Sequence, residues 1–268
     1  MPQDRARADD DEDSGSPPDV TIPLDADLDQ IHLVEEAVLA FISRFVESRP
    51  DAPALSPATE QSVIRELLGP PPATGVPIGD LLSTYAAAID TGFDTTSPGF
   101  LSYIPTGGLY TSALGSFLGA ATNQYTGGQH AAPGAVAIEQ SVIDWMTSLF
   151  GLPESSGGIL LSGGSVANLT AVVTAREQMG EDLSGGVIYA SQRSHHSIVK
   201  AARIAGVASK RVRMVPVDHR LRMDPDALND MVSVDISAGL RPMMIVATAG
   251  TTDTGAIDPL RRCADTAV

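Results

Sequence analysis

Cysteine is nearly absent from this 268-residue chain, in which Cys263 is the only one. A single thiol excludes an internal disulfide, and no Cys/His cluster has the spacing of zinc ligands, so we expect no metal site. Cys263 is expected to be a small buried hydrophobic residue. Apolar runs long enough to span a bilayer are missing, and so is a basic and then apolar leader. These absences predict a soluble cytoplasmic protein that does not contact a membrane.

Positive charge is scarce as well, because 17 Lys and Arg residues stand against 33 Asp and Glu, for a formal net charge of −16. A balance this acidic argues against a nucleic-acid groove. The acidic residues are concentrated at the N-terminus, where residues 1–29 hold ten of them and only two Arg. Residues 1–28 have few apolar side chains to offset the entropy of ordering, so we expect a disordered acidic tail.

Residues 29–96 are predicted to form a helical arm. Asp27 and Asp29 are candidate N-caps for a helix whose apolar residues recur at helical spacing. These residues are Ile31, Val34, Val38, Ile42 and Phe45. A second short helix is predicted within ATEQSVIRELL, between proline-rich stretches at residues 50–57 and 69–77. The first helix has no obvious partner within its own segment, so its apolar face needs another surface to cover it.

Residues 97–268 contain more glycine and less charge, which predicts that the main domain begins there. Its clearest element is a helix near residues 135–149, which ends at Gly151. The apolar face of this helix comprises Ile138, Val142, Trp145, Met146 and Leu149. Trp145 is therefore expected to lie in the core.

Short apolar runs and helical patterns alternate through the rest of the chain. Strands are predicted at residues 159–161, 187–190, 212–217 and 243–248, and helices at residues 165–178, 196–205 and 225–232. Alternation of this kind predicts an α/β fold with a mostly parallel sheet that is covered by helices on both faces. Ligands in such folds bind at the carboxyl ends of the strands.

Gly163, Gly164 and Ser165 follow the first predicted strand and open the next helix. A helix N-terminus presents unpaired N–H groups and the positive end of the helix dipole, so it can bind an anion. Glycines let the backbone approach phosphate oxygens closely, and Ser165 can donate its hydroxyl. The stretch is neither a P-loop nor a G-x-G-x-x-G fingerprint. On spacing alone, a tight turn with a serine cap and no ligand explains it equally well.

His195 and His196 precede the helix that follows the second predicted strand. An imidazole there can stack on a planar ring, although a His-His pair at a helix start is more often a cap or a surface feature. The hydroxyl groups of Thr248, Thr251 and Thr252 follow the last predicted strand. Phosphate donors, a flat ring and hydroxyls at three strand ends together predict a site for a phosphorylated aromatic cofactor.

Four motifs occur in a specific order: SPGFLSYIPTGG, SGGSVAN, YASQRSHHSIVKA and ATAGTTDTGAIDPL. This order resembles the pyridoxal-phosphate-dependent group II amino-acid decarboxylases, which include the aromatic-amino-acid, glutamate and diaminobutyrate decarboxylases. The resemblance covers residues 30–268. It implies a fold-type I large domain, pyridoxal 5′-phosphate as cofactor and decarboxylation of an L-amino acid substrate.

The resemblance also implies roles for individual residues. The turn Gly163–Ser165 resembles the loop that binds the cofactor phosphate. His195, six residues after Tyr189, resembles the histidine that stacks on the pyridine ring and assists proton transfer, and Thr252 resembles the threonine beside it. Thr106 corresponds to a residue near the substrate, contributed across a dimer interface.

The remaining implications concern assembly and the second half of the site. His196 stands where the family commonly has Ser or Tyr, so no catalytic role is assigned to it. The helices of the N-terminal arm imply a homodimer, in which the arm wraps the partner subunit. The family's ring-nitrogen aspartate and Schiff-base lysine follow the last motif, and the sequence ends at Val268 before both. Lys200 and Lys210, the only lysines, occupy other positions.

The chain is therefore expected to be a truncated part of a decarboxylase that is inactive alone. Two alternatives stay open: another fold-type I enzyme, such as an aminotransferase or a carbon–sulfur lyase, and a non-catalytic relative that binds a phosphorylated ligand or regulates a partner. The identity of the amino acid is left open.

Overall fold

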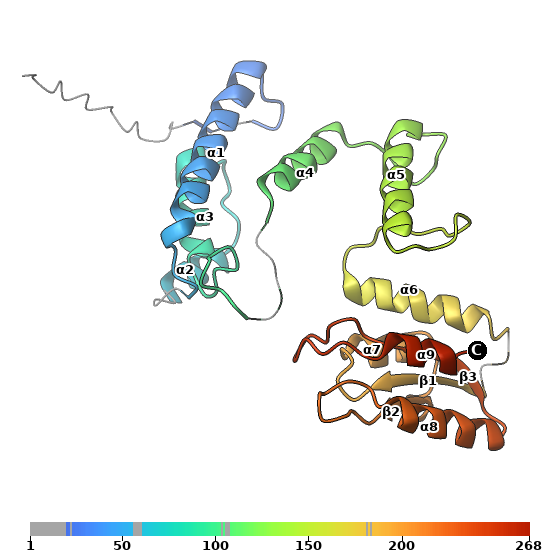
Figure 1. The fold of residues 1–268 in the computed structure, drawn as a ribbon. Coiled ribbons are helices and arrows are strands. Elements are labelled where there is room, and N and C mark those ends of the chain that lie inside the picture. Colours follow the sequence, from blue (N-terminus) through green and yellow to red (C-terminus); the bar gives the residue numbers. More distant parts are fainter. Residues whose placement is uncertain are drawn as a thin grey trace, which may run out of the picture. The chain divides into compact units, whose positions relative to one another are not determined.

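A computed structural model of the chain describes residues 20–21, 23–55, 61–102, 104, 108–180, 182 and 184–268. The chain divides into two compact units, Met1–Leu114 and Gly115–Val268 (Figure 1). Most of the predicted acidic tail, residues 1–19, lies outside the described residues, and so does Thr106. The predicted domain boundaries after residues 28 and 96 stay predictions. Within the described ranges, no helix has the length and apolar character to cross a membrane.

The first unit is helical. Its helices are α1 (Leu28–Ser48), the short η1 (Arg49–Asp51), α2 (Gln61–Leu67) and α3 (Ile78–Ile89). The predicted N-cap Asp27 is confirmed, because its carboxylate accepts a hydrogen bond from the Gln30 N–H at 2.9 Å while the Gln30 side chain accepts from the Asp27 N–H at 3.1 Å. This reciprocal capping box satisfies two amide groups that would otherwise lack partners.

Helix α3 was not predicted, and it changes the expectation for α1. The Phe41 ring of α1 meets the Tyr85 ring of α3 edge to face, with centroids 5.8 Å apart. Helix α1 therefore contacts α3 within its own segment, through a residue that is not in the predicted apolar stripe. The cover is incomplete, because Ile31 and Leu39 stay exposed.

Helix α4 (Tyr110–Thr122) crosses the boundary between the two units. The rest of the chain belongs to the second unit. The second unit contains α5 (Pro133–Leu149), α6 (Gly164–Glu177), β1 (Gly186–Ser191), α7 (Ser197–Ile204), η2 (Ser209–Arg211), β2 (Val212–Val215), α8 (Pro225–Ser237), β3 (Arg241–Val246) and α9 (Leu260–Thr266). Three of the predicted strands and all of the helices predicted in this region are confirmed within a few residues. Helices α4 and α9 were not predicted.

The strands form a parallel sheet in the order β2-β1-β3, with Tyr189 of β1 paired to Arg213 of β2 and to Ile245 of β3. All six residues of β1 are buried. Ile188 and Ala190 pack with α6 and α7 in one cluster, whereas Val187 and Tyr189 pack with α8 and α9 in the other. Figure 1 shows α6 and α8 on opposite sides of the strands. The predicted α/β fold with helices on both faces is confirmed.

The strand predicted at residues 159–161 is not found, because these residues have no regular secondary structure. Ile159 is 61% exposed, and in the described part of the chain no strand lies beside the segment to pair with it. An isolated run of three residues cannot satisfy its backbone groups by itself, so its apolar character alone does not make a strand.

The expectation that Trp145 lies in the core is wrong. The helix α5 forms as predicted, but Trp145 is 61% exposed, and Ile138 and Leu149 on the same face are also exposed. The residue of α5 that this unit buries is Ile143. The apolar pattern thus located the helix correctly but not its buried side, because Ile143 is not among the residues of the predicted apolar face.

Cys263 is buried as expected, and its Sγ lies 3.8 Å from the Sδ of Met223. Burial raises the pKa of this thiol, and the charge of Asp258 acts in the same direction. A buried neutral thiol of this kind is a packing residue.

A buried polar cluster joins β1, β2 and α8. The Tyr189 hydroxyl donates to Asp235 Oδ2 at 3.0 Å. Arg213 donates two further hydrogen bonds to the same carboxylate, from Nε at 2.9 Å and from Nη2 at 2.6 Å. The Arg213 hydrogen bonds lower the pKa of Asp235, and burial followed by the Asp235 hydrogen bond raises the pKa of Tyr189 above its ordinary 10.0. The neutral phenol is therefore the form that the fold stabilises.

Replacing Tyr189 with Phe is expected to lower the free energy of unfolding by about 1–2 kcal/mol at neutral pH, because a buried carboxylate loses one donor. In the parent chain the Tyr189 contribution is present below pH 10.0 and is lost as pH rises through the higher folded pKa. The variant should lack this alkaline component. Urea unfolding followed by circular dichroism between neutral pH and pH 11 measures both effects, and the exposed Tyr125→Phe is the control. Equal curves for the two variants would contradict the prediction.

Candidate functional site

The glycine turn predicted from the sequence lies at the N-terminus of α6. Gly163 is the N-cap residue, with φ +153°, a conformation that other residues rarely adopt, and its carbonyl accepts from the N–H groups of Val166 and Ala167 at 3.1 Å. No side chain caps the helix. In the described residues, the N–H groups of Gly164 and Ser165 have no hydrogen-bond partner. Two free donors thus face outward at the positive end of α6.

Space around this turn is open. A Cβ atom built on Gly163 or Gly164 would meet no other atom within 4 Å. Ser165 is exposed, so its hydroxyl adds a third donor to the two N–H groups. Three hydrogen-bond donors with open space in front of them fit the oxygens of a phosphate group.

The predicted ring-stacking residue, His195, is tied to the same helix. Its Nδ1 lies 2.7 Å from the Ser197 hydroxyl and accepts from the Ser197 N–H at 3.2 Å. The Ser197 hydroxyl also accepts from Asn168 Nδ2 at 2.8 Å, one turn into α6. Hydrogen bonds through Ser197 and Asn168 therefore connect His195 to α6, the helix that begins at the glycine turn.

Asn168 and Ser197 were not predicted as site residues. They lie within the quoted motifs SGGSVAN and YASQRSHHSIVKA, but spacing along the chain could not show that they meet, because 29 positions separate them. The one available signal was that Ser197 is a polar residue directly after the His-His pair, at the start of a helix.

His196 stacks obliquely on His195, with ring centroids 4.1 Å apart. The proximity of His195, and then of Lys200, lowers the pKa of His196. His196 is exposed, and the expectation that it has no catalytic role stays a prediction.

The loop after β3 carries the predicted Thr252. Asp258, only 2% exposed, ties this loop to the sheet by accepting from the Met223 N–H at 2.7 Å and from the Thr248 N–H at 2.8 Å. The Thr251 hydroxyl is buried and lies 2.6 Å from that of Thr254. Thr252 therefore stands exposed on a loop whose two ends are fixed.

One ion pair joins this loop to the segment after β1. Arg193 Nη1 lies 3.2 Å from Asp253 Oδ2, with both side chains partly exposed. Arg193 is two residues before His195, and Asp253 follows Thr252. The segments that carry His195 and Thr252 are thus neighbours at the carboxyl ends of β1 and β3.

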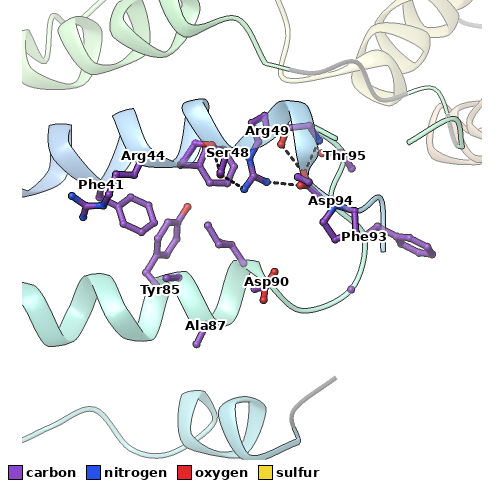
Figure 2. Close-up of a pocket in the computed structure, with 17 residues that line it drawn as sticks. Phe41, Arg44, Ser48, Arg49, Tyr85, Ala87, Asp90, Phe93, Asp94 and Thr95 are labelled. Carbon is purple, nitrogen blue, oxygen red and sulfur yellow. Dashed lines mark hydrogen bonds and ion pairs between the residues drawn. The ribbon is translucent and has the colours of Figure 1, made fainter. Parts of the chain in front are cut away.

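A separate cavity of about 810 Å³ lies in the first unit, and Figure 2 shows its lining from α1, α3 and the loop after α3. Arg49 pairs there with Asp94, and its guanidinium lies 3.9 Å from the centroid of the Phe45 ring. Burial raises the pKa of Asp94, but hydrogen bonds from Thr96 and the charge of Arg49 outweigh it and lower the pKa overall. No residue predicted for the cofactor site lines this cavity.

Comparison with known proteins identifies the family. The model of the pyridoxal-dependent decarboxylase conserved domain matches residues 71–267. The chain belongs to the pyridoxal-dependent decarboxylase family. The match begins in the first unit and includes the glycine turn, His195 and the loop after β3.

Three relatives illustrate the family. The aromatic-L-amino-acid decarboxylase of Bacillus atrophaeus is 34% identical over 63% of this chain and 35% of its own length, and the L-2,4-diaminobutyrate decarboxylase of Rhizobium meliloti is 32% identical over 91% of this chain and 50% of its own. A crystal structure of Oryza sativa TDC with PLP and tryptamine has 26% identity and a TM-score of 0.82, covering 92% of this chain and 54% of that one. The chain spans about half the length, or less, of the curated relatives it matches.

Replacing Asp258 with Asn is expected to lower the free energy of unfolding by about 2–3 kcal/mol. Each carboxylate oxygen accepts from one backbone N–H. In the Asn variant the side-chain NH2 group replaces one of these oxygens, so it faces another donor and cannot accept from it. Urea unfolding followed by circular dichroism measures the loss. The exposed Asp265→Asn removes the same charge and should leave stability unchanged. A D258N variant as stable as D265N would contradict this account of the loop.

Proposed function

We propose that the chain binds pyridoxal 5′-phosphate at the carboxyl ends of its parallel strands and that the whole protein decarboxylates an L-amino acid. The observation that carries the proposal is the junction between the N-terminus of α6 and His195, made through Asn168 and Ser197. Membership of a pyridoxal-dependent family supports the cofactor, and the Oryza sativa structure contains PLP.

The phosphate is proposed to bind at the glycine turn. The N–H groups of Gly164 and Ser165 and the Ser165 hydroxyl would donate to its oxygens, while Gly163 and Gly164 leave room for the group to approach the backbone. The positive end of the α6 dipole adds a favourable interaction with a dianion. These donors orient the cofactor by its least reactive part.

His195 is proposed to lie against the pyridine ring, and Thr252 beside it. When bound, pyridoxal phosphate supplies an electron sink for the charge left by the departing carboxylate. The imidazole of His195 holds the plane of the ring and provides a proton at Nε2, because Nδ1 is engaged by Ser197. The catalytic role therefore falls to His195 and not to its neighbour His196.

The substrate class is proposed to be an L-amino acid, with Thr106 near it. The relatives named above act on different side chains, aromatic or diamino, so the class is held at this level. The whole protein is proposed to be a cytoplasmic homodimer, with residues 29–96 as the arm against the partner and residues 97–268 within the cofactor-binding domain. The apolar residues left exposed on α1 and α5 support such an assembly.

Neither lysine of the sequence is proposed to hold the cofactor covalently. Lys200 is exposed on α7, and Lys210 is exposed in η2 ahead of β2. The 268-residue chain alone is therefore expected to bind the cofactor reversibly without turning over substrate.

Replacing Gly164 with Asp is expected to weaken binding of pyridoxal phosphate by about a hundredfold, because a carboxylate opposes the dianion where charge-assisted hydrogen bonds form. Equilibrium dialysis of the 268-residue chain measures the affinity. Gly134→Asp is a matched control, since Gly134 lies in the first turn of α5 and also has open space around it. Pyridoxal without its phosphate should bind both variants and the parent equally weakly. Unchanged affinity in a folded G164D variant would overturn the phosphate assignment.

The reaction itself is tested on the native gene product. Release of carbon dioxide from labelled aromatic amino acids, glutamate and diaminobutyrate is the expected result for at least one substrate, and it should require added pyridoxal phosphate. Amino-group transfer to a keto acid without carbon dioxide release would instead place the protein among the aminotransferases. Mass spectrometry of the same preparation gives the length of the polypeptide that carries the activity.

A further inference from the structure

A line of three side chains runs from α6 to the imidazole of His195. Asn168 Nδ2 lies 2.8 Å from the Ser197 hydroxyl oxygen, and that oxygen lies 2.7 Å from His195 Nδ1. Ser197 is 3% exposed, so water does not compete for its hydroxyl. The Ser197 N–H reaches the same ring nitrogen at 3.2 Å.

We propose that Asn168 and Ser197 are positioning residues that hold His195 in the neutral tautomer with its proton on Nε2. The role of this tautomer in the reaction rests on the proposed function, in which His195 lies against the cofactor. The tautomer itself is a property of the chain without any ligand, so the two can be tested separately.

The direction of each hydrogen bond determines the tautomer. The amide nitrogen of Asn168 can only donate, so the Ser197 oxygen accepts from it. The single proton of the Ser197 hydroxyl is then free to point at His195 Nδ1, and the Ser197 N–H points at the same atom. Two donors facing one ring nitrogen require that nitrogen to be the acceptor. The ring proton therefore stays on Nε2.

Orientation follows from the same contacts. The backbone N–H of Ser197 is fixed at the first residue of α7, so it holds the plane of the His195 ring as well as its protonation. Asn168 lies on α6 only a few residues beyond Ser165. The same hydrogen bonds therefore fix the direction of the Nε2–H bond relative to α6, the helix proposed to bind the phosphate. A proton donor with a fixed direction is what proton transfer to a bound cofactor needs.

Asn168→Asp is expected to reverse the donor and acceptor roles in these hydrogen bonds. A carboxylate presents only acceptors, so the Ser197 hydroxyl turns its proton toward α6, and its oxygen then faces His195 Nδ1 as an acceptor. Ser197→Ala removes the hydroxyl but keeps the backbone donor, whereas Ser197→Thr keeps both. Thr174→Asp, at an exposed position further along α6, places the same added charge away from the line.

The experiment is ¹⁵N nuclear magnetic resonance of the full 268-residue chain labelled at histidine, without cofactor, at about pH 8, above the ordinary titration range of imidazole. Single substitutions of the five histidines assign the resonances. The parent chain should show His195 with a protonated Nε2 and an unprotonated Nδ1. N168D should shift the tautomer ratio toward Nδ1–H by about fivefold, and S197A by a smaller factor in the same direction. S197T and T174D should match the parent, and the amide spectra report whether each variant is folded.

A mixed tautomer in the parent chain, or an unchanged ratio in folded N168D, would overturn the proposal. If N168D does not fold, S197A compared with S197T decides the question in the same way. Cofactor affinity is measured separately by dialysis. A chain that fails to bind pyridoxal phosphate but keeps the Nε2 tautomer refutes the proposed function alone, whereas a chain that binds it with a mixed tautomer refutes the positioning role alone.

Discussion

The parallel pairing of β1 with both β2 and β3 is the constraint on which the second unit depends. Because β1 is buried along its whole length, its odd and even residues each need a layer of helices, and α6 and α7 on one face and α8 and α9 on the other supply them. Parallel strands also end at the same edge, so the segments that follow β1 and β3 meet there. The buried contact of Tyr189, Asp235 and Arg213 fixes the sheet from the side opposite α6. The candidate site is thus a consequence of the sheet geometry and not of any single loop.

Two kinds of polar group lie at that edge: groups whose hydrogen bonds are all made within the chain, and groups that have no partner in the described residues. Asp258 belongs to the first kind, because each of its carboxylate oxygens accepts a hydrogen bond from a backbone N–H. These two bonds hold the loop after β3 in place. The first N–H groups of α6 are left without partners in the described residues, although the same helix is tied to His195 through Asn168. A site for an anion needs both: a rigid surround with its polar groups satisfied, and a few donors left free to bind.

Much of the fold was readable from the sequence, since β1, β2, β3 and the helices that cover them produce clear local patterns. Trp145 and the run at residues 159–161 were misread for a common reason. An apolar pattern shows that a face or a segment seeks cover, but it does not show whether the same unit provides that cover. The glycine turn and His195 were recognisable through motifs, whereas the contact of Asn168 with Ser197 depends on how α6 packs on α7 and has no signature in local spacing.

The exposure of Trp145 has a consequence for spectroscopy. It is the only tryptophan in the sequence, and it lies on α5, outside both buried clusters of the sheet. Its side chain is 61% exposed, so unfolding of the sheet is expected to change its emission little. The same residue is a selective reporter of anything that covers α5, because a shift of its emission to shorter wavelength records the loss of water from that one face.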